Sequence, residues 1–130
     1  MKLITKEIQK RLPVLGSTEN DKDPMVQVKL FGGSGCTWLI TEYDPDSRVA
    51  FGHCDLGDHD NAELGYISLD ELESLKFPPF DLGVERDVYF TPTPLSEILD
   101  PKEKTVTSLL HEKIQNAKEQ LDKGVDDVQR

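Results

Sequence analysis

Alternation of apolar and polar residues predicts strands through the middle of the chain. In Met25–Phe31, the residues Val26, Val28 and Leu30 alternate with polar ones, a period of two. A run rich in aromatic and β-branched residues follows at Cys36–Tyr43, and further strands are predicted at Arg48–Cys54, Glu63–Ile67 and Arg86–Thr91. The first four runs are separated only by a glycine-rich turn and two polar turns. Connections this short favour an antiparallel sheet of four to five strands.

A period of three to four residues predicts helices. Residues 1–12 form the first, with Thr5 as its N-cap and Pro13 at its end. Ser68 and Glu71 match a capping box, which begins a short helix that ends before Phe77. Another short helix starts with Pro94 in its first position and runs to about Leu99.

A long C-terminal helix is predicted after Asp100. Apolar residues recur every three or four positions as far as Gly124, namely Val106, Leu109, Leu110, Ile114, Ala117 and Leu121. We therefore expect an α+β fold in which residues 1–99 form a single domain. Residues 100–130 form a helical extension, packed on that domain or available to a partner. The expected core contains Val26, Val28, Leu30, Trp38, Ile40, Val49, Phe51, Tyr66, Leu69, Leu72, Val88 and Phe90.

Acidic residues are concentrated in the middle of the chain. The sequence has 25 Asp and Glu residues against 15 Lys and Arg, for a net charge of -10. Within Glu42–Glu73 the only basic residue is Arg48, whereas residues 101–130 are neutral overall. This distribution argues against direct binding to nucleic acid or to anionic lipid, since both need clustered Lys and Arg. We expect the partner to be another protein, and the pattern leaves the oligomeric state open.

Composition also bears on the compartment. The two cysteines, Cys36 and Cys54, are too few for a disulfide framework. The N-terminal segment lacks the apolar stretch of a secretion signal, and no run approaches the length of a membrane span. We therefore expect a soluble cytoplasmic protein with free thiols and no cofactor.

Four segments carry a family resemblance: MKLITKEIQKRLP with GSTE after it, WLITEYDPDSRVAFG, LGYISLDELES and VERDVYFTPTPLSEI. Their order and spacing over residues 1–99 resemble bacterial domain-of-unknown-function family 2958. The resemblance implies a setting on plasmids and other mobile elements, but no chemistry, although some members carry a lipase label. The segment His53–Asn61 departs from the family's usual sequence at this place, which is apolar and glycine-rich.

The lipase label can be tested on the glycine-rich turn. Gly32-Gly33-Ser34-Gly35-Cys36 lacks the last glycine of a G-x-S-x-G nucleophile elbow, and it lies between two strands rather than before a helix. Asp55 with His53 or His59 would supply the other residue types of a Ser-His-Asp triad. A hairpin turn nevertheless explains the glycines better. Paired carboxylates for acid/base catalysis are also available, but the sequence places no cleft beside them. These pairs come from Glu42, Asp44 and Asp46, or from Glu85 and Asp87. We therefore assign no catalytic residue.

A metal site is a weaker hypothesis. Cys36, His53 and His59, with Cys54, offer thiolate and imidazole ligands that suit zinc. The usual paired spacings are absent, and His53 and Cys54 point to opposite faces of a strand. An EF-hand loop starting at Asp58 fails because Glu63 stands where glycine is required.

The acidic turn gives the sharpest binding hypothesis, with Asp55, Asp58, Asp60 and Glu63 as candidate partner-binding residues. We expect a non-enzymatic interaction or accessory protein whose contact surface is this turn or the C-terminal helix. One alternative is an acidic mimic of nucleic acid that inhibits a defence or DNA-processing protein. The other is a small hydrolase or metal-dependent enzyme.

Overall fold

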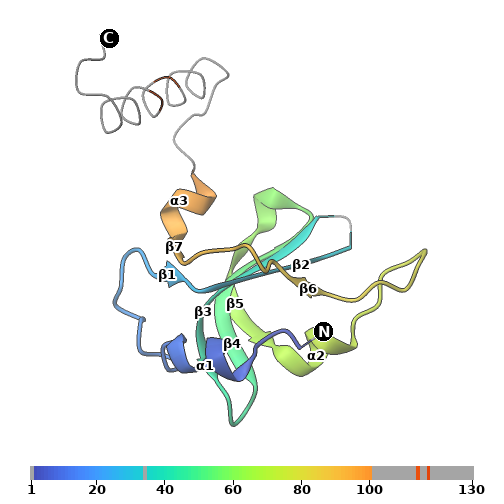
Figure 1. Cartoon of the computed structure of the whole chain (residues 1–130), viewed down its shortest axis with the longest axis horizontal. Coiled ribbons are helices and arrows are strands. Elements are labelled where there is room, and N and C mark those ends of the chain that lie inside the picture. Colours follow the sequence, from blue (N-terminus) through green and yellow to red (C-terminus); the bar gives the residue numbers. More distant parts are fainter. Residues whose placement is uncertain (1, 34, 101–113, 115–116, 118–130) are drawn as a thin grey trace. The chain divides into compact units, whose positions relative to one another are not determined.

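An antiparallel sheet of five strands organises the described part of the chain (Figure 1). The computed structural model describes residues 2–33, 35–100, 114 and 117. The strand order is β5-β4-β3-β2-β6, so the predicted meander and α+β fold are confirmed. The strands are β2 (Val28–Gly32), β3 (Cys36–Asp44), β4 (Val49–Leu56), β5 (Glu63–Ser68) and β6 (Glu85–Arg86).

Two predicted strands are wrong in extent. The run Met25–Phe31 is interrupted at Gln27, and its first part, β1 (Met25–Val26), pairs with β7 (Thr93–Pro94) in a separate two-stranded ladder. The run Arg86–Thr91 ends as a strand at Arg86. The Asp87 side chain accepts a hydrogen bond from the Tyr89 N–H at 3.0 Å, and the Phe90 N–H donates to the Asp87 carbonyl at 3.2 Å. This local turn replaces the ladder hydrogen bonds that a longer strand would make.

The short helices begin near the predicted capping residues. α1 (Lys6–Arg11) is shorter than the predicted helix over residues 1–12, because Thr5 caps it by accepting a hydrogen bond from the Ile8 N–H at 3.2 Å. α2 (Leu69–Ser74) has Ser68 as its N-cap, which accepts from the Glu71 N–H at 3.2 Å. α3 (Leu95–Leu99) begins one residue after Pro94, whose backbone is still part of β7.

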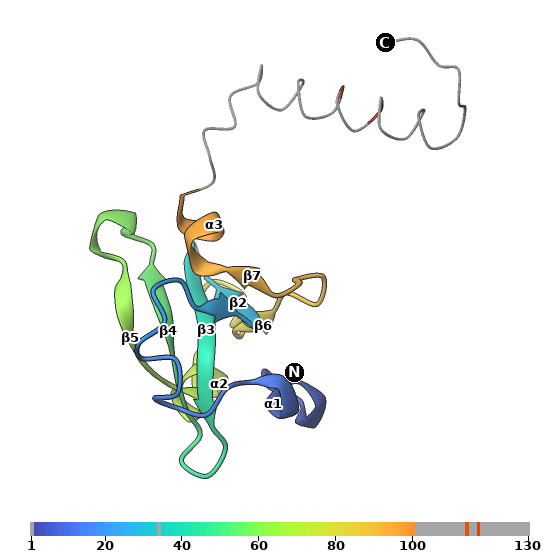
Figure 2. The same ribbon diagram turned by 90° about the vertical axis from the view of Figure 1, so that its left-hand side faces the viewer.

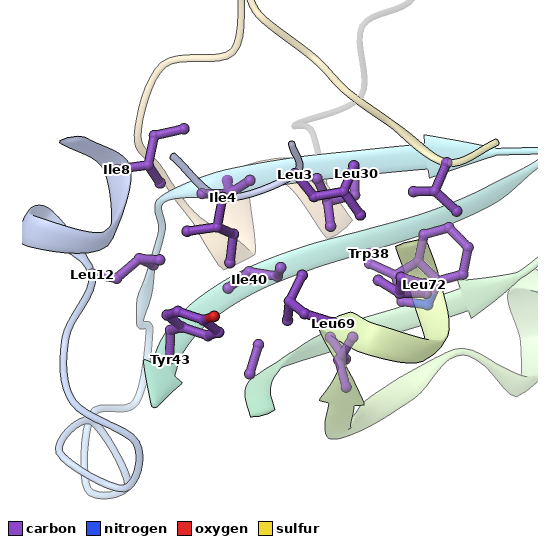
Figure 3. Close-up of a cluster of buried hydrophobic side chains, with 14 residues drawn as sticks. Leu3, Ile4, Ile8, Leu12, Leu30, Trp38, Ile40, Tyr43, Leu69 and Leu72 are labelled. Atoms are coloured by element: carbon purple, nitrogen blue, oxygen red, sulfur yellow. The ribbon is translucent and has the colours of Figure 1, made fainter. Parts of the chain in front are cut away.

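The main core lies on one face of the sheet, under the N-terminal segment, α1 and α2 (Figure 3). Figure 3 shows Ile8 and Leu12 from the α1 segment, Leu30, Trp38 and Ile40 from the strands, and Leu69 and Leu72 from α2. Of the twelve predicted core residues, seven are buried: Val26, Val28, Leu30, Trp38, Ile40, Leu69 and Leu72.

The other predicted core residues divide into two groups. Val49, Phe51 and Phe90 are half-buried. Tyr66 and Val88 are exposed, so their prediction is wrong. Tyr66 lies on the sheet face opposite Ile67, which is buried, and Val88 lies in the turn that follows β6.

The chain divides into two compact units, residues 1–95 and residues 96–130. In the second unit, the Asp100 N–H donates to the Ser96 carbonyl at 2.9 Å. The predicted helix over 101–124 lies outside the described residues except for Ile114 and Ala117, which are helical and exposed. Among the described residues, no helix is both long and apolar enough to cross a membrane.

Candidate functional site

The outer face of the sheet, opposite the main core, carries exposed apolar side chains. Register places Tyr66 beside Phe51, and Phe51 beside Glu42, in one row across β5, β4 and β3. The next row contains Leu64, His53 and Leu39. Leu39 is buried, but Leu64 is 51% exposed and Tyr66 is 74% exposed. The rings of Phe51 and Tyr66 meet edge to face, with centroids 5.2 Å apart.

A groove of about 390 Å³ lies on this face, between β4 and β5 on one side and the loop over residues 16–24 on the other. Figure 2 shows this loop in blue, running past β4 and β5. Phe51, Leu64 and Tyr66 supply apolar lining, and Thr18, Asp21 and Lys22 supply polar lining from the loop. The groove is therefore apolar along the strands and polar along the loop.

A bulge in β3 turns Glu42 toward the groove. The pairing of β3 with β4 shifts between Ile40 and Glu42, so Thr41 is an extra residue. Ile40 and Tyr43, three positions apart, consequently both face the main core, and Glu42 faces outward. The Thr41 hydroxyl donates to the Phe51 carbonyl at 3.2 Å, which holds the bulge against β4.

The Glu42 carboxylate fixes the loop that forms the groove wall. It accepts hydrogen bonds from the Gly16 N–H at 2.6 Å, from the Thr18 N–H at 2.8 Å and from the Thr18 hydroxyl. Burial of the carboxyl opposes its ionisation, but these hydrogen bonds outweigh burial and lower the pKa of Glu42. Glu42 is 3% exposed and ionised at neutral pH, so its role is to position the loop.

The acidic turn between β4 and β5 lies next to this face. Asp55 accepts a hydrogen bond from the Gly57 N–H at 2.9 Å and contacts the His59 ring nitrogen Nδ1. The Gly57 hydrogen bond and then the His59 contact lower the pKa of Asp55, and the same contact raises the pKa of His59. Asp55 thus shapes the turn, whereas Asp58, Asp60 and Glu63 are exposed. Of the four predicted partner-binding residues, these three are exposed, and the Asp58 carboxylate also accepts a hydrogen bond from the Asn61 side-chain amide.

The structure does not gather the metal candidates into a site. Cys36 packs against the main core, and so does Cys54, which pairs with Trp38. His53 pairs with Leu39 on the outer face, and His59 lies on the exposed turn. Burial, and then the nearby Glu63, raises the pKa of the Cys54 thiol. No group of three or more His, Cys, Asp or Glu residues within the described segments could hold a metal ion.

The glycine-rich segment is the turn of a β-hairpin. β2 and β3 pair up to Gly32 and Cys36, and Gly33 and Gly35 have positive φ. Ser34 lies outside the described residues. A nucleophile elbow joins a strand to a helix, so the backbone here has the wrong connection for one.

Other charged groups serve the fold. The Arg48 side chain donates to Asp70 at 2.7 Å and contacts Glu73, which joins the turn before β4 to α2. The Arg86 guanidinium donates to the Lys2 carbonyl at 2.6 Å and to the Leu3 carbonyl at 2.9 Å. These contacts hold the N-terminal segment beside β6.

No local signal in the sequence marks the groove. Phe51 and Tyr66 were predicted as core residues, and Glu42 was considered only as one of several turn carboxylates. The alternation in β5 is the one signal that bears on the site: Leu64 and Tyr66 share a face that Ile67 does not. This alternation does not indicate which face of β5 is covered by the rest of the chain.

The fold and this surface together define a small α+β domain whose antiparallel sheet is packed on one face and only partly covered on the other. Residues 3–108 match the model of the family described as "Protein of unknown function (DUF2958)", and the chain belongs to that family. No curated protein and no solved structure matches the chain.

Proposed function

We propose that this chain is a non-enzymatic interaction module that binds another protein through the outer face of β5. The observation that carries the proposal is the exposed pair Leu64 and Tyr66, two residues apart on one face of the strand. Contiguous apolar side chains left in water are characteristic of binding surfaces. The setting implied by the family resemblance, an accessory protein of a bacterial or mobile-element system, belongs to the same proposal.

Two features of the groove support protein contact rather than catalysis. Sites for small molecules enclose most of their ligand, whereas Tyr66 at this groove is largely open to solvent. Glu42, the carboxylate most deeply buried there, already accepts hydrogen bonds from the loop. A carboxylate held ionised in this way is a poor general base near neutral pH.

The acidic turn extends the proposed surface. Asp58, Asp60 and Glu63 lie at the start of β5, where they favour a partner with basic residues and speed its association. The alternative of a nucleic-acid mimic uses the same turn, but it needs a longer row of charges. The other acidic turn, at Asp44 and Asp46, lies at the far end of β4, roughly 25 Å away. The mimic is therefore our second candidate.

The test compares two matched pairs of substitutions in the full-length tagged chain. Leu64→Ser with Tyr66→Ser removes the proposed surface, and Phe80→Ser with Leu82→Ser removes an exposed apolar pair elsewhere. We expect the wild type and the Phe80/Leu82 variant to capture one dominant protein from a lysate of the source cells. The Leu64/Tyr66 variant should capture at least about tenfold less, which corresponds to about 1.4 kcal/mol.

Thermal unfolding of each variant checks that the fold is retained. Equal capture by both variants would contradict the proposed surface. The absence of any dominant partner would contradict the interaction function itself and favour the enzyme alternative.

A further inference from the structure

The free edge of β5 is unprotected by the usual devices. β5 pairs with β4 in unbroken register from Glu63 to Ser68, and within the described segments nothing pairs with its other side. Natural edge strands are commonly shortened, bulged or interrupted by proline or lysine, which prevents pairing with another chain. β5 has six residues, no bulge, and neither proline nor lysine. Its outward N–H and C=O groups can therefore accept a further strand.

The opposite edge of the sheet, at β6, does not offer a comparable site for an added strand. β6 has two residues, and the chain then turns at Asp87. An edge of that length provides too few backbone groups for a stable added strand. Strand addition therefore belongs to β5, where Leu64 and Tyr66 would also form cross-strand contacts with apolar residues of the new strand.

Charge determines which occupant suits this edge. Asp58, Asp60 and Glu63 lie at the N-terminal end of β5. Asp70 and Glu71 lie just beyond its C-terminal end, where Arg48 supplies one positive charge against Asp70, Glu71 and Glu73. A second copy paired antiparallel would place the acidic turn of one copy beside Asp70 and Glu71 of the other. Parallel pairing would place the two acidic turns together. Both arrangements oppose like charges, which is unfavourable.

We propose that β5 accepts an extended segment of a partner protein as a sixth strand. The segment has apolar side chains at alternate positions and Lys or Arg at its ends. This inference rests on the proposed function and specifies how the partner binds. Backbone hydrogen bonds supply affinity, the outer-face contacts with Leu64 and Tyr66 supply specificity, and the flanking acids select a basic segment.

The experiment uses fluorescein-labelled peptides of about ten residues, in which valine and threonine alternate between lysine pairs. Binding to the full-length chain is measured by fluorescence anisotropy. Two further peptides carry N-methyl groups on one or the other alternate set of backbone amides. Because a strand pairs through only one of its edges, one methylated set should weaken binding at least tenfold and the other should not.

Charge reversal is the matched control on the protein side. The variant with both Asp60→Lys and Glu63→Lys should bind the lysine peptide at least tenfold more weakly than the wild type does. It should bind more tightly a peptide in which glutamate replaces lysine. These side chains are exposed, so the variant should keep its fold.

Three results would overturn strand addition. They are no binding of the lysine peptide up to about 1 mM, equal effects of the two methylated sets, and a dimer of the free chain in sedimentation that the Tyr66→Ser substitution abolishes. The last result would assign the edge to a second copy. If lysate capture still depends on Leu64 and Tyr66, the proposed function stands and only strand addition fails.

Discussion

Glu42 links the shape of the groove to a single ionised side chain. Burying an acidic residue that is only 3% exposed is costly unless hydrogen bonds compensate for the lost water. The N–H groups of Gly16 and Thr18 and the Thr18 hydroxyl provide that compensation. The loop wall of the groove therefore depends on the charge state of one carboxyl group.

Replacing Glu42 by Gln should destabilise the protein by about 2 kcal/mol at neutral pH, because an amide NH₂ would then face a backbone N–H donor. The folded-state pKa of Glu42 lies below its ordinary value of 4.5, so ionisation stabilises the fold. This contribution is fully present above about pH 4.5 and is lost as the pH falls through the folded-state pKa. Urea unfolding of both proteins between about pH 3 and pH 7 measures it.

Glu19→Gln, at an exposed position of the same loop, is the control and should have little effect. A stability difference between wild type and Glu42→Gln that stays constant down to pH 3 would contradict the assigned role.

At the scale of single residues, the sequence predicted caps and buried strand positions better than the site. Thr5 and Ser68 cap helices as predicted because capping depends on neighbours in the chain. Tyr66 was assigned to the core because β5 has apolar residues on both of its faces. Which face is covered depends on the N-terminal segment, α1 and α2, and these contacts cross long distances in sequence.

At the scale of elements, the close packing of β4 on β3 depends on one of two cross-strand glycines, Gly52. Gly52 lies opposite Gly65 in the β4–β5 ladder, on the face of the main core. A Cβ atom added to Gly52 would lie 1.9 Å from the Leu39 carbonyl oxygen, whereas one added to Gly65 would meet nothing within 4 Å. Neither glycine has positive φ, so space rather than backbone conformation distinguishes the two positions.

We therefore expect Gly52→Ala to lower the free energy of unfolding by about 3 kcal/mol, because β3 and β4 must separate. Gly65→Ala should leave it unchanged or raise it by about 0.5 kcal/mol, since alanine restricts the unfolded chain. Equilibrium denaturation of the two variants gives the comparison. Equal losses at both positions would show that the β3–β4 contact is not the cause.

The elements that were predicted correctly have strong local patterns, and the error after Arg86 arises where the Asp87 side chain forms a local hydrogen bond in place of strand pairing. Cys36–Tyr43 and Glu63–Ile67 each differ from the observed strand by one residue at one end. The run after Arg86 has an equally good alternation, but the Asp87 side chain forms a turn there. Periodicity alone cannot distinguish these outcomes, because Asp can hydrogen-bond its own neighbouring backbone.

At the scale of the whole molecule, folding divides the acidic residues into groups with different roles. Glu42 is buried, Asp70 and Glu73 interact with Arg48, and Asp55 shapes its turn. Asp58 and Asp60 remain exposed in the turn before β5, and Glu63 is exposed at the start of the strand, on the face opposite Leu64 and Tyr66. Composition predicts an acidic middle, but only the fold shows which acids remain exposed at the ends of β5. The C-terminal helix remains a prediction and a second candidate contact surface.

The most direct test of the β5 surface is amide hydrogen exchange of the full-length chain with and without its captured partner. The alternate backbone amides within Glu63–Ser68 that face away from β4 should exchange at least about tenfold more slowly in the complex, because they become hydrogen-bonded. The hairpin closed by backbone hydrogen bonds between Phe77 and Leu82, which carries Phe80, should be unaffected. Protection of that hairpin, with exchange in β5 unchanged, would contradict the account.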